Sequence, residues 1–172
     1  MKVLGRLIVF SLVSFLMVSC GGNQKTKTYS LNDIEFVYEG PLFEGSNPAQ
    51  YIAKVDLKAI FKEDFKEGMS IEKVVLKKAD VIASDASMYD GISSLVLSLS
   101  ADNPEIKMQE LAVLNPVEKG ITQAVLKPSL KADAADFFSE KQFYIVLDAT
   151  LSKDIEMGLN LKGNFEFELS YK

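Results

Sequence analysis

Hydrophobic and polar residues alternate most regularly near the C-terminus, over residues 158–171. Successive side chains of a strand point to opposite faces of its sheet, so this period predicts a strand with one buried and one hydrated face. Gly163 falls on the apolar face, where it indicates a bulge or a close approach of another segment. The apolar face carries Leu159, Leu161, Phe165, Phe167, Leu169 and Tyr171, and the polar face carries Asn160, Lys162, Asn164, Glu166, Glu168 and Ser170.

Shorter segments with the same period recur along the chain, separated by turn residues about every ten positions. About eight such segments predict an all-β fold, a single immunoglobulin-like β-sandwich or a partly open barrel, with one or two short helical turns. The likeness to small immunoglobulin-like envelope domains is one of architecture alone. The period is clear in residues 51–57, 92–100 and 142–151, and weaker in residues 34–38, 71–83, 106–113 and 121–127.

Two segments favour a short helix. Residues 133–140 have helical composition and begin with an aspartate, and residues 57–65 place four apolar side chains on one helical face. The strand expected over residues 51–57 competes with the second helix for Leu57, and the spacing alone leaves that boundary open.

A short pattern occurs twice, in residues 64–71 and again ninety positions later in residues 154–161. Each copy has a glycine four positions after an aspartate, followed by apolar residues. The pattern predicts two hairpin connections in which Gly68 and Gly158 adopt positive φ. An ancient duplication would explain the likeness, but convergent turn chemistry is favoured because turns reuse few residue types.

The N-terminus has the organisation of a secretory signal. Lys2 and Arg6 are followed by a run of apolar residues, 7–18, that only Ser11 and Ser14 interrupt. A bilayer core requires about 20 apolar residues, so this run is too short to span it but suits the hydrophobic region of a signal peptide.

The residues that follow resemble the lipobox of bacterial lipoproteins. Leu16, Val18, Ser19 and Cys20 fit its pattern, whereas Met17 stands where the box prefers Leu, Val or Ile. The resemblance covers only the first twenty residues. It implies that Cys20 receives a diacylglyceryl group and becomes the first residue of the mature protein. The alternative is an ordinary secretory peptide that is cut elsewhere and leaves Cys20 unmodified.

Beyond Cys20 the chain is polar and glycine-bearing up to Thr28, which predicts a flexible tether. In the lipoproteins that the signal resembles, an Asp after the cysteine favours the inner membrane, so Gly21 implies the outer membrane. Some Gram-negative lipoproteins that reach the cell surface have acidic residues just after the cysteine. This tether has none, so the resemblance implies a periplasm-facing position. The expected organisation is a signal peptide (1–19), a lipidated cysteine with its tether (20–28) and a β-sandwich domain (29–172).

Charge and composition exclude several function classes. Without Lys2 and Arg6 the chain has 17 basic and 24 acidic residues, a net charge of −7 that opposes binding to nucleic acid and to anionic lipid. The sequence has no His, and Arg6 is its only Arg. Ser-His-Asp and Cys-His catalysis and ordinary zinc or copper sites are therefore excluded, and one cysteine forms no intrachain disulfide. We expect no enzyme activity, no cofactor and no metal.

Carboxylates are the remaining candidates for catalysis. Asp148, Glu166 and Glu168 lie on the polar faces of predicted strands, where two of them could act as the acid and the nucleophile or base of a glycosidase. Hydrated surface charge is the more common role of such residues.

Two loops carry clustered oxygen ligands that could hold a structural calcium. Neither has the spacing of an EF-hand loop, and the same residues are typical of turns. The ligands would be Asp85, Asp90, Asp102, Asn103 and Glu105.

Phe43 and Tyr89 are aromatic residues in predicted loops. They could stack against a sugar, but we expect them to cover the ends of the core. The apolar stripe that includes Leu161, Phe165 and Phe167 could fill the space between the sheets or line a cavity for an acyl chain, and a filled core is the more common outcome.

The sequence therefore predicts a lipoprotein anchored to the outer membrane through acyl chains on Cys20, the one functional residue that it assigns. The domain is expected to be a non-enzymatic binding or accessory module of an envelope assembly, with a protein partner. A carrier of a lipid or other hydrophobic ligand is the first alternative, and a carboxylate-dependent glycan hydrolase is the second.

Overall fold

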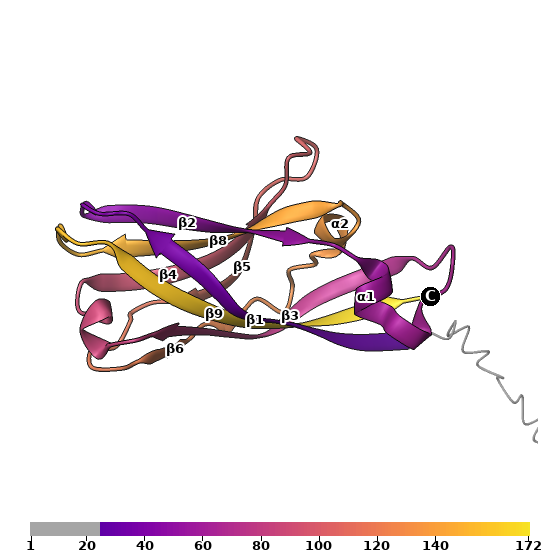
Figure 1. Ribbon diagram of the computed structural model, residues 1–172, viewed down its shortest axis with the longest axis horizontal. Coiled ribbons are helices and arrows are strands. Elements are labelled where there is room, and N and C mark those ends of the chain that lie inside the picture. Colours follow the sequence, from indigo (N-terminus) through magenta and orange to yellow (C-terminus); the bar gives the residue numbers. More distant parts are fainter. Residues whose placement is uncertain (1–24) are drawn as a thin grey trace, which may run out of the picture.

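Two antiparallel sheets face each other in the computed structural model, which describes residues 25–172 (Figure 1). Cys20 and the predicted signal peptide lie outside these residues. Short helical segments are α1 (Leu57–Phe61), η1 (Lys62–Asp64), η2 (Ala86–Tyr89) and α2 (Ala135–Phe138). The strands of the described part are β1 (Lys25–Tyr38), β2 (Gly45–Lys54), β3 (Ile71–Ala83), β4 (Ile92–Ser100), β5 (Gln109–Leu114), β6 (Gln123–Val125), β7 (Lys127–Pro128), β8 (Gln142–Leu151) and β9 (Leu159–Tyr171).

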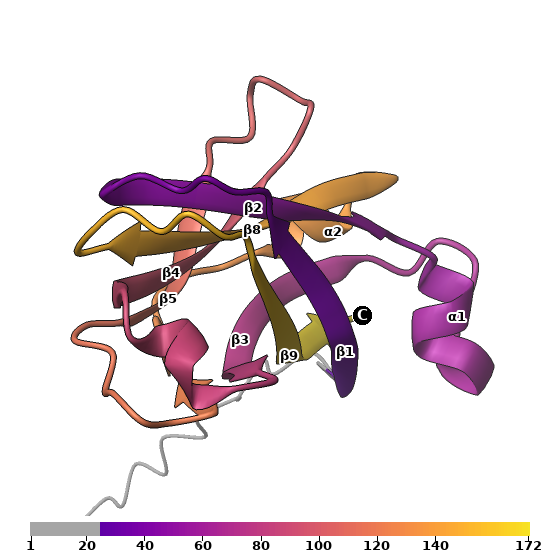
Figure 2. The ribbon, with the colours of Figure 1, turned by 60° about the vertical axis from the view of Figure 1, so that its left-hand side comes forward.

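The strand order is β1-β9-β3-β6 in one sheet and β2-β8-β4-β5-β7 in the other. Figure 2 shows the two layers from a second side. At one edge the chain passes directly from β6 to β7 and so from one sheet to the other, and the amide of Leu126 between them donates to Ala79 O at 2.9 Å. β1 and β2 are the outer strands on the opposite edge and lie in different sheets. The architecture is the predicted β-sandwich rather than a closed barrel.

The first strand begins at Lys25, four residues before Tyr29, where the sequence analysis starts the domain. Residues Lys25 to Thr28 pair with the end of β9, with Lys25 opposite Tyr171 and Thr28 opposite Glu168. The strand start is largely exposed and lacks apolar alternation, because it lies at a sheet edge. Its backbone hydrogen bonds to β9 order it, and only the tertiary structure supplies that partner.

Two other boundaries differ from the prediction. β2 begins at Gly45 and contains Pro48, which a strand tolerates at a sheet edge where its missing N–H needs no partner. It ends at Lys54, and Leu57 belongs to α1, whose first amides donate to the Asp56 carboxylate at 3.0 and 3.1 Å. Both predicted helices are present, although each is shorter than expected.

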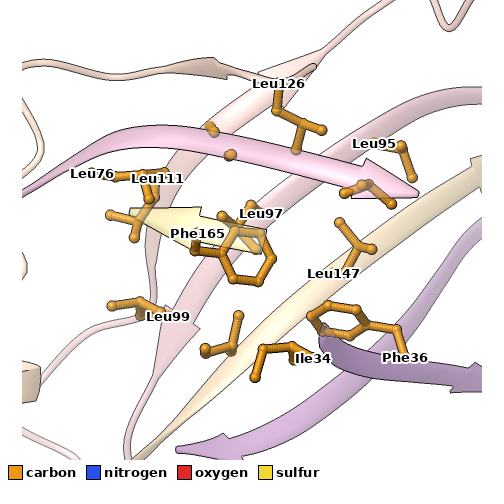
Figure 3. Packing of buried hydrophobic residues seen from close by; sticks show 14 of the residues in the cluster. Ile34, Phe36, Leu76, Leu95, Leu97, Leu99, Leu111, Leu126, Leu147 and Phe165 are labelled. Carbon is orange, nitrogen blue, oxygen red and sulfur yellow. The ribbon is translucent and has the colours of Figure 1, made fainter. Parts of the chain in front are cut away.

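The space between the sheets is filled by side chains. Leu161, Phe165 and Phe167 are at most 1% exposed. Phe165 meets Phe36 of β1 edge to face with ring centroids 6.2 Å apart, and Figure 3 shows both rings among leucines of the facing sheet. The predicted apolar stripe is thus core, and its side chains occupy the space between the sheets.

Gly163 marks a close approach, as predicted. A Cβ atom there would lie 2.7 Å from Cε2 of Phe165 and 2.9 Å from Cε2 of Phe36. The β1 register shifts between Leu31 and Ile34, directly beside Ile34's partner Gly163. The missing side chain therefore leaves room for two aromatic rings, and the paired strand β1 bulges next to it.

Two buried tyrosines predict a loss of stability at alkaline pH. The hydroxyl of Tyr38 donates to Leu147 O at 2.9 Å, and that of Tyr89 donates to Val81 O at 2.7 Å. Burial raises the pKa of Tyr89 to about 12 and raises the pKa of Tyr38 still further. Since the folded-state pKa values exceed the ordinary value of 10.0, the neutral hydroxyls stabilise the fold fully below pH 10, and this contribution is lost as the pH rises through the folded values.

We expect the free energy of unfolding, measured by urea denaturation, to fall steeply above pH 10. The tyrosinate absorbance of Tyr38 and Tyr89 should rise only together with unfolding. Tyr89→Phe should reduce the pH dependence of the free energy of unfolding. Ionisation of all six tyrosines near pH 10 in a protein that stays folded would contradict this account.

Candidate functional site

Four loops cross between the sheets at one end of the sandwich. One of them, residues 115–122, connects β5 to β6, and the other three are linked to one another by hydrogen bonds. The three linked loops comprise residues 39–44, 84–91 and 152–158, and we call them the distal tip. β1 runs from Lys25 at the opposite end to Tyr38 beside the tip, roughly 40 Å away at the usual rise of a strand. Figure 1 shows the tip at the left and the C-terminus, where Lys25 pairs, at the right.

Backbone hydrogen bonds hold the tip loops together. Leu42 and Ile155 form an antiparallel bridge in which each amide donates to the other residue's carbonyl at 2.8 Å. The amide of Glu44 donates to Asp154 Oδ1 at 2.8 Å. The amide of Ser152 donates to Gly91 O at 2.9 Å, which links loop 84–91 to loop 152–158. The tip is therefore a cross-linked surface rather than three independent loops.

The tip presents two large apolar side chains to solvent. Phe43 is 64% exposed and Met157 is 76% exposed. Their neighbours Leu42 and Ile155 point toward the core, so the bridge between these two residues fixes the backbone that carries Phe43. The side-chain amide of Asn47 adds a hydrogen bond to Phe43 O at 2.8 Å. Phe43 is thus exposed on a backbone that is held in place.

The charge of the tip is strongly negative. Its three loops contain six carboxylates and one lysine, Lys153, which gives a net charge of −5, and all seven side chains are exposed. The carboxylates are Glu39, Glu44, Asp85, Asp90, Asp154 and Glu156. Hydrogen bonds from the hydroxyl and the amide of Ser87 lower the pKa of Asp85, so this group in particular remains ionised at neutral pH.

Of the two aromatic residues that the sequence analysis placed in loops, one is buried and the other is exposed. Tyr89 is 1% exposed and covers the end of the core, as expected. The expectation that Phe43 does the same is wrong, because Leu42 fills that place beside Ile155 and turns Phe43 outward. Composition and spacing cannot separate the two positions, since only one member of the adjacent Leu42–Phe43 pair can face the core.

The structure does not bring the candidate glycosidase carboxylates together. Asp148 lies on the outer face of β8 and accepts hydrogen bonds from the Ser46 hydroxyl and, at 3.2 Å, from the Asn47 amide. Glu166 and Glu168 lie on the outer face of β9, in the other sheet. The whole thickness of the sandwich separates them from Asp148. Only Glu166 and Glu168 share a surface, and Glu168 lies 3.5 Å from the Lys77 ammonium.

The two predicted calcium loops lie at opposite ends of β4. Asp85 and Asp90 precede this strand, and Asp102 to Glu105 follow it. Asp102 instead accepts a hydrogen bond from the Tyr144 hydroxyl at 2.8 Å, which raises the pKa of that tyrosine. The five residues do not form one ligand set, and residues 25–172 contain no group of three carboxylates, thiols or imidazoles with metal-binding geometry.

A buried carboxylate that the sequence did not single out lies in the middle of the first sheet. Asp80 is 4% exposed on the outer face of β3, and its Oδ2 lies 3.0 Å from the Lys78 ammonium. The lysine is exposed, and its pKa is raised by its hydrogen bond to Asp80. A cavity of about 90 Å³ lies beside the pair. One carboxylate that is neutralised by a lysine does not provide the paired acid and base of a hydrolase.

A shallow groove of about 330 Å³ lies at the end opposite the tip, where the chain enters β1 and leaves β9. Its walls mix both signs of charge, with Lys25, Lys66 and Lys172 close to Asp64 and Glu67. The ammonium of Lys27 pairs with Asp64 at 2.8 Å. The groove therefore lacks the excess of negative charge that the tip has.

No helix within residues 25–172 is long and apolar enough to span a bilayer.

Comparisons with known proteins leave the family of this chain open. No protein-family model matches it, and no curated protein matches it. Among solved structures, one from Desmodium yellow mottle tymovirus aligns over 99% of this chain and 94% of its own, with 11% identity and a TM-score of 0.32. One from Mud crab tombus-like virus aligns over 87% and 90%, with 9% identity and a TM-score of 0.27. Both scores are too low to support an argument about function.

Proposed function

We propose that this chain is an envelope lipoprotein of the outer membrane whose β-sandwich serves as a non-enzymatic binding module. The distal tip is the observation that carries the proposal. It presents Phe43 and Met157 on a hydrogen-bonded backbone, at the end of the domain farthest from Lys25. A module that is tethered at one end and displays apolar side chains at the other is suited to meet a partner away from the membrane.

The alternatives gain less support from the described residues. A carrier between the sheets would need the space that Leu161, Phe165 and Phe167 occupy. A hydrolase would need two carboxylates in one cleft, whereas Asp148 faces away from Glu166 and Glu168. An accessory role through surface contacts requires neither arrangement.

The anchor is tested by Cys20→Ser in the full chain. We expect the variant to move from the membrane fraction to the soluble fraction and to lose incorporation of labelled fatty acid, because several acyl chains on one residue provide the anchoring. Ser19→Ala keeps a small residue before the cysteine and should retain both properties. A Cys20→Ser protein that stays in the membrane fraction would overturn the lipoprotein assignment.

A further inference from the structure

The exposed apolar side chains of the distal tip have the character of a binding anchor. Aromatic residues and methionine are enriched in the cores of protein interfaces, where an aromatic ring often contributes a large share of the binding energy. Met157 has a flexible thioether that adapts to irregular surfaces. Phe43 provides a larger and more rigid surface.

The tip is already ordered without a partner. Hydrogen bonds fix the loop around the aromatic ring. Leu42 and Ile155 form a backbone bridge, the backbone amide of Glu44 donates to Asp154, and the side-chain amide of Asn47 donates to Phe43 O. Binding then costs mainly the ordering of the exposed side chains, because the backbone that carries them needs no rearrangement. Rigid presentation favours a defined pocket over nonspecific apolar contact.

The charge around the anchor selects the kind of partner. The net charge of −5 over the three loops would repel anionic lipid headgroups and the same tip of a second copy. A surface that combines an apolar pocket with a rim of lysine or arginine would complement both the anchor and its carboxylates. Glu39 and Glu44 are exposed in the loop that carries Phe43, and Glu156 adjoins Met157.

From these features we propose that the distal tip docks through Phe43 and Met157 into an apolar pocket, rimmed by lysine or arginine, on a partner protein. This inference rests on the proposed binding function and adds the contact site and the chemistry of the partner. It does not depend on which acyl group Cys20 carries.

Site-specific photo-crosslinking in the native host cells tests the proposal. The full chain carries p-benzoylphenylalanine in place of Met157, and the crosslinked peptides are identified by mass spectrometry. We expect an adduct with a protein segment that contains apolar residues beside lysine or arginine. Phe43→Ser in the same chain should lower the adduct yield at least about tenfold, as expected for an interface anchor.

Matched controls separate docking from simple exposure and charge. Met108, in the loop between β4 and β5, is 59% exposed, so p-benzoylphenylalanine there tests an apolar position of similar accessibility, and Leu130→Ser tests another that is 69% exposed. The probe at position 108 should not give this adduct, and Leu130→Ser should not lower the yield obtained with the probe at position 157. The pair Glu39→Lys and Glu44→Lys should abolish it, whereas Glu105→Lys with Glu110→Lys, which change as much charge elsewhere, should not.

Four outcomes would overturn the inference. These are an adduct with lipid, an adduct with a second copy of this chain, an adduct that survives the reversal of Glu39 and Glu44, and no adduct with the probe at position 157. Each leaves the result of Cys20→Ser untouched, so failure of the docking site can be distinguished from failure of the anchor.

Discussion

Replacing Phe138 by alanine is expected to lower the free energy of unfolding by about 3–5 kcal/mol. Phe138 lies in α2, is 1% exposed, and connects both sheets through three aromatic neighbours. Its ring centroid lies 6.0 Å from that of Tyr29 in β1, 5.0 Å from that of Phe143 in β8 and 5.4 Å from that of Phe167 in β9. The substitution would leave a cavity where the helix closes one end of the core.

Urea denaturation followed by circular dichroism measures the effect. A small domain has a total stability of about 5–15 kcal/mol, so the alanine variant should retain little of it. Phe138→Leu should keep most of the buried volume and recover most of the loss. Phe43→Ala is the control, because a largely exposed ring should change stability by no more than about 0.5 kcal/mol. Equal losses for Phe43→Ala and Phe138→Ala would contradict the division between core and tip.

Substitution of Gly158 and of Gly68 is expected to lower stability for different reasons, so that alanine and asparagine rank in opposite orders at the two positions. Gly68 has φ +83° and open space around its Cβ position, so a side chain there suffers backbone strain alone. Gly158 lacks positive φ, but its Cβ position lies against the backbone of Tyr38 and 3.2 Å from Gly40 N. A side chain there would push two crossing segments apart, at a cost of about 1–3 kcal/mol or more.

Alanine and asparagine distinguish the two causes. Asparagine adopts positive φ more readily than alanine, so Gly68→Asn should be more stable than Gly68→Ala. Asparagine is also larger, so Gly158→Asn should be less stable than Gly158→Ala. Thermal or urea unfolding of the four variants measures both orders. The same order at both positions would show that one mechanism acts at both glycines.

The same pair shows why turns were predicted only in part. Residues 64–71 and 154–161 both connect elements, and Gly68 adopts the expected positive φ. Neither is a hairpin, because β2 and β8 belong to one sheet whereas β3 and β9 belong to the other. Turn residues show that the chain changes direction, but they do not show whether the next strand pairs with the previous one or crosses to the facing sheet.

Strand prediction succeeded where burial is one-sided and failed where pairing alone orders the chain. The alternation in residues 142–151 and 158–171 corresponds to β8 and β9, which are central strands with one face in the core. The start of β1 and the start of β2 lie at sheet edges and have little apolar periodicity. The hydrophobic period reports burial, and an exposed edge strand has too little burial to produce it.

The sequence by itself determined the all-β class and the strands that carry the core, and it contains no histidine. It also predicted the lipid anchor at Cys20, which remains a prediction. Only the tertiary structure decided that Asp148 is separated from Glu166 and Glu168, that Tyr89 is buried while Phe43 is exposed, and that three acidic loops meet at one end. The physical reason is that composition and period are local properties, whereas a surface is formed by loops whose neighbours depend on the order of strands in each sheet.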